Sequence, residues 1–261
     1  MRTCSFPVKS LGSVLPAAPD ASLLSAWIIS RYGQETDLIT WNIETTLKDQ
    51  LPAVEYPAAG GEYYAARLLD AFTNVREGAI FREFDVDQKA VRADSDLVNG
   101  LRKHCWWSMP APSGLDVRDE YFGDTEECAA SLLEAFASVC RLMRDAGIAG
   151  HILTTNTPNE EELTEFTGKK YLWAVPDTFL EMALEYQRDI VISRENTAQL
   201  PDLLDSYDIR RVYVCDPDAE SLTTVLGSFD PEYVFVCGVG PKEDRRSYWE
   251  HLVEITVKRD P

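Results

Sequence analysis

Short polar segments follow five apolar runs in the second half of the chain, and their residue types are those that bind small polar molecules. The apolar runs begin near residues 151, 171, 190, 212 and 233. The segments after them are Thr154-Thr155-Asn156, Pro176-Asp177, Ser193-Arg194-Glu195, Asp216-Pro217-Asp218 and Gly238-Val239-Gly240. Their hydroxyls, amides and carboxylates suit the recognition of a hydroxyl, amine or amide better than that of a polyphosphate. We therefore expect these segments to bind a small polar metabolite.

Two side chains in this region are candidates for catalysis. Asp216 stands beside a proline at the end of an apolar run and is a candidate acid, base or amine-binding group. Cys237, like Cys215 before it, ends a run, and its thiol is a candidate nucleophile if a nearby cation activates it. The remaining predicted ligand-binding residues are Thr155, Asn156, Asp177, Ser193, Arg194, Asp218, Gly238, Gly240 and Trp106. This set is compatible with a transferase or a lyase, identifies no cofactor, and leaves open whether the ligand is turned over.

Several of these residues also have a purely structural interpretation. Asp177, Asp218 and Thr157 are typical helix-capping and turn residues. A cysteine after valine at the end of a strand is commonly a buried structural residue. The structural interpretation is favoured for each residue taken alone, but as a set they define the edge where a pocket would open.

The sequence contains none of the familiar motifs for a nucleotide, a metal or a nucleophilic serine. Gly238-Val239-Gly240 lacks the third glycine of a dinucleotide fingerprint and is followed by Pro241, so these glycines are expected to permit a tight turn or the close approach of a ligand. Cys128 and Cys140 lie twelve residues apart on one predicted helix and cannot bind the same ion. We predict no metal site.

The segment from Lys103 to Gly114 is chemically dense, because it holds a histidine, a thiol and two indoles before a proline-broken stretch. Trp106 and Trp107 would point to opposite faces of an extended segment, so one can enter the core while the other lines a cleft. The alternative is a hydrophobic clasp between two halves of the chain. A rival function rests on the same pair: a non-catalytic interaction or regulatory protein that docks a partner through its acidic surface and a tryptophan-rich patch.

The five apolar runs are continuous rather than alternating, which is typical of strands covered on both faces. Helix-compatible segments separate them, so the pattern predicts an α/β fold with a mostly parallel sheet of short βα units. An α+β part would precede it, with residues 1–115 and 116–261 as two parts or as one continuous domain. Five units are too few to close an eight-stranded barrel alone. We therefore favour an open doubly wound sheet over a TIM-like barrel.

The rest of the chain gives more local expectations. We predict helices over residues 20–33, 63–72 and 124–147, each from apolar residues at helical spacing after a candidate cap. Residues 38–43 are rich in β-branched and aromatic side chains and are expected to form a strand. Residues 80–86 and 89–93 are expected to form a hairpin around Asp87-Gln88. Residues 248–259 should add an antiparallel edge strand.

Composition limits the classes of partner. The chain has 261 residues, is 45% hydrophobic and carries a formal net charge of −19. We expect no nucleic-acid partner, because binding to a phosphate backbone depends on clustered Lys and Arg. No apolar run is long enough to span a membrane, and six cysteines without C-x-x-C spacing are expected to be reduced. We expect a cytoplasmic protein with a small-molecule ligand, and self-association is left open.

Overall fold

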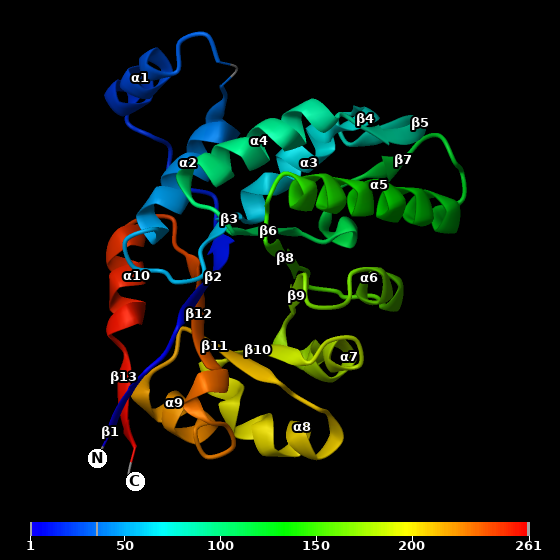
Figure 1. Cartoon of the computed structure of the whole chain (residues 1–261). Coiled ribbons are helices and arrows are strands. Elements are labelled where there is room, and N and C mark those ends of the chain that lie inside the picture. The colour runs from blue at the N-terminus through cyan, green and yellow to red at the C-terminus, as the bar shows by residue number, and fades with distance from the viewer. Residues whose placement is uncertain (1, 35, 260–261) are drawn as a thin grey trace.

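Eight parallel strands follow one another around a ring in the computed structural model, which describes residues 2–34 and 36–259 (Figure 1). In ring order they are β2 (Val8–Ser13), β3 (Ala58–Gly60), β6 (Trp106–Pro110), β8 (Gly150–Thr154), β9 (Tyr171–Ala174), β10 (Asp189–Ser193), β11 (Arg211–Cys215) and β12 (Val234–Gly240). Backbone pairing makes two four-stranded sheets, β10-β11-β12-β2 and β3-β6-β8-β9.

Two sets of contacts join these sheets. Parallel bridges from Lys9 to Tyr56 and from Ser13 to Gly61 connect β2 to the segment around β3. On the opposite side, Gln187 lies just before β10, and its side-chain amide connects this segment to β9. It accepts from the Trp173 amide at 2.9 Å and donates to the Trp173 carbonyl at 3.2 Å. A ring of eight parallel strands with helices outside it is a TIM barrel. The predicted α/β class and parallel βα units are confirmed, whereas the preference for an open sheet is wrong and the barrel alternative is correct.

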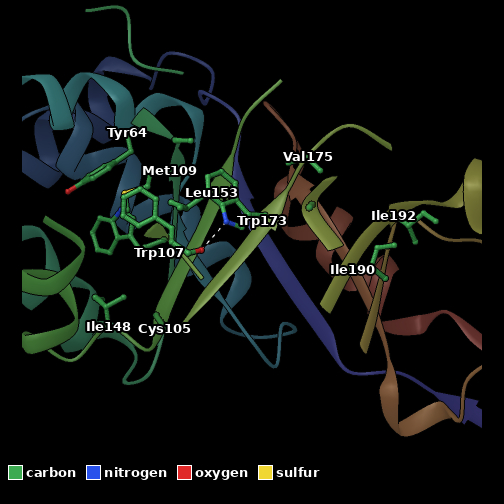
Figure 2. Packing of buried hydrophobic residues seen from close by; sticks show 14 of the residues in the cluster. Tyr64, Cys105, Trp107, Met109, Ile148, Leu153, Trp173, Val175, Ile190 and Ile192 are labelled. Atoms are coloured by element: carbon green, nitrogen blue, oxygen red, sulfur yellow. Dashed lines mark hydrogen bonds between the residues drawn. The ribbon is translucent and has the colours of Figure 1, made fainter. Parts of the chain in front are cut away.

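The inside of the barrel is filled by side chains from all eight strands. They are Leu11, Ala58, Trp106, Ile152, Leu172, Ala174, Val191, Tyr213, Cys215, Phe235 and Cys237. A larger apolar cluster lies between the strands and the outer helices (Figure 2). There, Trp107 is fully buried with its ring centroid 4.9 Å from that of Tyr64. Because both faces of the strands are buried, their apolar runs are continuous.

The helices connect successive strands or extend the loops between them. They are α1 (Ala21–Ser30), α2 (Leu38–Gln50), α3 (Ala65–Ala71), α4 (Gln88–Leu101), α5 (Thr125–Asp145), α6 (Glu160–Glu165), α7 (Leu180–Leu184), α8 (Leu200–Ser206), α9 (Ala219–Val225) and α10 (Arg245–Glu254). Short 3₁₀ turns η1 (Glu62–Tyr64), η2 (Pro112–Gly114), η3 (Asp177–Phe179), η4 (Arg194–Gln199) and η5 (Pro231–Tyr233) complete the connections.

Two smaller sheets lie outside the barrel. The first has the order β4-β5-β7, from β4 (Phe72–Arg76), β5 (Ala79–Val86) and β7 (Arg118–Asp119). The second pairs β1 (Arg2–Ser5) with β13 (Thr256–Arg259) in antiparallel fashion. This second pairing places the first and the last strand of the described chain side by side (Figure 1).

The predicted first helix and the predicted long helix are both confirmed. Asp20 caps α1 by accepting from the Ser22 amide at 2.8 Å, and Asp124 caps α5 by accepting from the Glu126 amide at 2.9 Å. The two helices differ in burial: α5 buries a stripe along its length, whereas α1 contains no buried residue and stands away from the barrel (Figure 1). A hydrogen bond of 2.8 Å from the Trp27 indole to Glu44 holds α1 against α2.

The strand predicted over residues 38–43 is wrong, because this segment begins α2. Asp37 caps the helix by accepting from the Thr40 amide at 2.8 Å. Ile43, Leu47 and Gln50 are all buried, and their spacing of four and three residues places them on one helical face. A cap and a buried helical stripe together outweigh the β-propensity of a few branched side chains.

The hairpin predicted around Asp87-Gln88 is also wrong. Asp87 caps α4, accepting from the Lys89 amide at 2.9 Å, and the second predicted arm lies within that helix. Strand β5 pairs instead with β4. The predicted helix over residues 63–72 is confirmed by η1 and α3. In the predicted edge strand of residues 248–259, only residues 256–259 are extended, since residues 248–254 belong to α10.

Candidate functional site

Four in-register residues from neighbouring strands form a polar row inside the barrel. Ser193 of β10 is in register with Cys215 of β11, Cys215 with Cys237 of β12, and Cys237 with Lys9 of β2. The thiols of Cys215 and Cys237 pack with the interior cluster, and their sulfur atoms are 3.3 Å apart. Ser193 and Cys215 are the last residues of their strands, so the row reaches the carboxyl end of the barrel, where TIM-barrel proteins bind their ligands.

Asp177 is tied to the end of β10. It follows β9, and its carboxylate accepts hydrogen bonds from the Ser193 hydroxyl and the Asn196 amide, and from the Ser193 backbone amide at 3.3 Å. No side chain caps the short turn η3, which Asp177 begins. The structure thus brings together two predicted site residues, Asp177 and Ser193, and adds Asn196, which the sequence alone did not single out.

Asp216 is exposed immediately beyond β11 and has a left-handed backbone, with φ of 44°. Its amide donates to the Cys237 carbonyl at 2.9 Å, and one carboxylate oxygen accepts from the Tyr248 hydroxyl at 2.5 Å. Burial, reinforced by the hydrogen bond to Asp216 and by its charge, raises the pKa of Tyr248 above its usual range. The phenol therefore stays protonated and orients the carboxylate, whose second oxygen is left available to a ligand.

Gly238 and Gly240 allow protein side chains, rather than a dinucleotide, to approach β12. A Cβ at Gly238 would overlap the Tyr248 hydroxyl, and one at Gly240 would lie 2.6 Å from the Ser13 Oγ atom. Neither glycine has a positive φ. In place of the expected ligand, Tyr248 and Ser13 of the protein itself approach these glycines closely. The expected tight turn is wrong, because both glycines lie within β12.

The other predicted ligand-binding residues lie in different settings. Thr155 is buried and accepts from the Thr157 amide at 3.1 Å, while Asn156 is exposed next to it. Arg194 is exposed and forms an ion pair of 2.8 Å with Glu195. Asp218 accepts from the Ser221 amide at 2.8 Å in a capping box at the start of α9. For Asp218 the geometry is that of the structural interpretation.

Trp106 lies at the other end of the barrel from these residues. It is the first residue of β6 and is in register with Gly150, the first residue of β8. Trp106 points into the barrel and Trp107 into the outer core, so the expected opposite orientations are found. The two indoles form no exposed patch, since Trp107 is fully buried. The rival function therefore loses the tryptophan patch, one of the two features on which it was based.

Lys9 is an interior charged residue that sequence reasoning missed. Its side chain is 2% exposed, and its Nζ atom lies 3.5 Å from the centroid of the Trp106 ring. Burial lowers the pKa of the lysine well below its ordinary value, against the opposing influence of Cys237 and Asp189. Lys9 lies between the apolar residues Val8 and Leu11, but β2 itself was not predicted from the sequence.

The amino end of the barrel has a competing cavity of about 330 Å³, between β9 and β10. Its two best-placed guanidinium groups are already engaged, because Arg210 pairs with Asp189 at 2.8 Å and Arg188 pairs with Asp208. By contrast, Asp216 at the carboxyl end keeps one carboxylate oxygen free of protein donors within the described residues. We therefore place the candidate site at the carboxyl end.

Two kinds of feature are absent from the part of the chain that the structure describes. Across residues 2–34 and 36–259, no three His, Cys, Asp or Glu side chains are gathered as a metal ion would require. No helix in the same part of the chain has the length and apolarity needed to cross a bilayer.

Comparisons with known proteins show the fold. No family model matches the chain, and no curated protein matches it. A protein of Listeria monocytogenes assigned as a vitamin-B12 independent methionine synthase has a TM-score of 0.62 at 13% identity, over 97% of this chain and 96% of that one. A B12-independent methionine synthase of Shewanella sp. W3-18-1, solved with selenomethionine, has a TM-score of 0.58 at 11% identity, over 90% of both chains. The chain is thus an α/β barrel similar in fold to these two proteins.

Proposed function

We propose that the chain is an enzyme that binds a small, amine-bearing polar metabolite at the carboxyl end of the barrel. The observation that carries this proposal is the carboxylate of Asp216, which is fixed by Tyr248 through one oxygen and open to a ligand through the other. A fixed carboxylate is an acceptor for an ammonium group and a candidate proton acceptor during a reaction.

Neighbouring groups provide further polar contacts. The Ser193 hydroxyl and Asp177 are linked at the end of β10, and the half-buried Cys215 lies in register between Ser193 and Cys237. Arg194 on the same edge would recognise a carboxylate on the ligand if its pairing with Glu195 opened. The fold shared with a methionine synthase solved with selenomethionine, an amino acid, supports a ligand of this kind. A transferase or a lyase fits this set best.

The test is thermal stabilisation across a panel of amines, amino acids and their deaminated analogues. We expect at least one amine-bearing compound to raise the melting temperature of the wild type and its deaminated analogue to raise it less. Asp216→Asn should remove the effect, because it replaces the charged acceptor with a neutral amide of the same size. The matched control is Glu220→Gln, which removes an exposed acid four residues away.

Two results would contradict the proposal. One is a panel with no stabilising compound for the wild type. The other is an amine whose stabilising effect is the same in the wild type, Asp216→Asn and Glu220→Gln.

A further inference from the structure

The two thiols at the carboxyl end of the barrel are placed to react with each other. Cys215 and Cys237 are register partners on adjacent parallel strands, and both belong to the interior cluster. Their sulfur atoms are 3.3 Å apart, in contact but not bonded. Adjacent strands lie about 4.8 Å apart, within the range of Cα separations of about 4.4 to 6.8 Å that a disulfide spans.

The two thiols differ in access. Cys215 is half-buried at the mouth of the barrel, next to Asp216, whereas Cys237 is fully buried behind it. Burial raises the pKa of the Cys237 thiol, with the neighbouring thiol and Asp216 acting in the same direction. A reagent from solvent therefore meets Cys215 first, and Cys237 is in position to complete the reaction.

We propose that Cys215 and Cys237 form a reversible disulfide across β11 and β12 when the chain meets a peroxide. The Cys215 sulfur attacks one peroxide oxygen, the O–O bond breaks, and a sulfenic acid and one water are produced. The Cys237 sulfur then attacks the Cys215 sulfur, the S–O bond breaks, and the hydroxyl leaves as a second water with the proton of Cys237. Two thiols lose two electrons and one peroxide gains them.

The modification would change the lining of the proposed site without requiring a ligand there. The disulfide would replace the two thiols in the row between Ser193 and Lys9. It would also covalently join β11, which Asp216 follows, to β12, where Gly238 lies against Tyr248. Small thiols reverse it by thiol–disulfide exchange. Because its test needs no metabolite, it can fail or succeed independently of the proposed function.

The experiment treats the full chain with equimolar hydrogen peroxide and compares it with the dithiothreitol-reduced chain. We expect an intact mass lower by about 2 Da, for the two thiol hydrogens. Peptide mapping should find the Cys215 and Cys237 peptides joined, and dithiothreitol should separate them. Cys215→Ser and Cys237→Ser should each prevent the loss, whereas Cys128→Ser, which removes another half-buried thiol, should retain it.

A second probe detects the neighbouring pair of thiols and needs no substituted variant. Phenylarsine oxide joins two neighbouring thiols with the release of one water, so it should protect the Cys215 and Cys237 peptides from later alkylation. Three results would overturn the proposal: a mass loss that maps to other cysteines, oxidation of Cys215 to a sulfinic acid while Cys237 remains a free thiol, or no reaction of either thiol with peroxide and arsenical.

Discussion

Replacing Lys9 with methionine is expected to stabilise the chain by about 2 kcal/mol at pH 7, because an interior ammonium without a carboxylate partner gives way to an apolar side chain of similar length. Within the described residues, the Nζ atom of Lys9 has no hydrogen bond or ion pair, and its contact is the Trp106 ring at 3.5 Å. A cation–π contact contributes roughly 0.5 to 2 kcal/mol. Burial lowers the pKa of Lys9, so the cost of desolvating the ammonium exceeds the attraction of Cys237 and Asp189.

The same lowered pKa fixes the pH dependence of the effect. The folded chain binds the lysine proton more weakly than the unfolded chain does, so protonation destabilises the folded state at every pH below the unfolded pKa of about 10.4. This penalty shrinks as the pH rises toward that value. The stability difference between Lys9→Met and wild type should therefore narrow between pH 7 and pH 10.

Urea unfolding of the wild type, Lys9→Met and Lys242→Met measures this prediction. Lys242 is exposed, so its replacement should change the free energy of unfolding by less than about 0.5 kcal/mol. A destabilised Lys9→Met variant, or a stability difference that does not vary with pH, would show that Lys9 is better satisfied in the barrel than its contacts indicate.

Replacing His151 with glutamine is expected to make the chain more resistant to acid. His151 lies fully buried on β8, with its Nε2 atom 3.0 Å from the Cys140 carbonyl and its Nδ1 atom without a partner among the described residues. Burial, with a smaller effect from Arg144, lowers the pKa of His151 to about 3. The folded state thus holds a neutral imidazole whose Nε2–H donates to Cys140.

Because the unfolded chain takes up the histidine proton at a pKa of about 6.5, stability is lost as the pH falls below that value. The loss from this residue is about 2 kcal/mol between pH 7 and pH 5. The glutamine introduced by His151→Gln has an amide that can donate to the same carbonyl and does not titrate, so the variant should keep that stability. Urea unfolding at pH 7, 6 and 5 gives the measurement.

His251→Gln serves as the control, because His251 is exposed on α10. Its replacement should leave the pH dependence of the free energy of unfolding as it is in the wild type. An acid dependence that is equal in the wild type and His151→Gln would mean that the buried imidazole is not the group that titrates.

The strands of the second half of the chain were predictable, because a strand that is buried on both faces has a continuous apolar run. The barrel was not, because its closure depends on two strands without that pattern. Strand β2 carries Lys9, Ser10 and Ser13, and β3 is only three residues long. The bridges from Lys9 to Tyr56 and from Ser13 to Gly61 close the ring between residues far apart in sequence. No local sequence pattern predicts them.

The candidate site was predictable to a similar extent. The rule that ligands bind beyond the carboxyl ends of parallel strands selected Asp177, Ser193 and Asp216, which lie at that end. It could not supply Tyr248, whose hydroxyl reaches Asp216 from a helix 32 residues further along the chain. Trp106, also predicted to bind the ligand, is the first residue of β6 and so lies at the amino end of the barrel.

Backbone hydrogen exchange with the most strongly stabilising compound from the amine panel tests the location of the site most directly. We expect slower exchange at residues 177–179, 193–196 and 215–218, at the carboxyl end of the barrel, with no change at residues 167–171 and 185–189, around the amino-end cavity. Protection confined to that cavity, with exchange at the carboxyl end unchanged, would mean that the ligand does not bind beside Asp216.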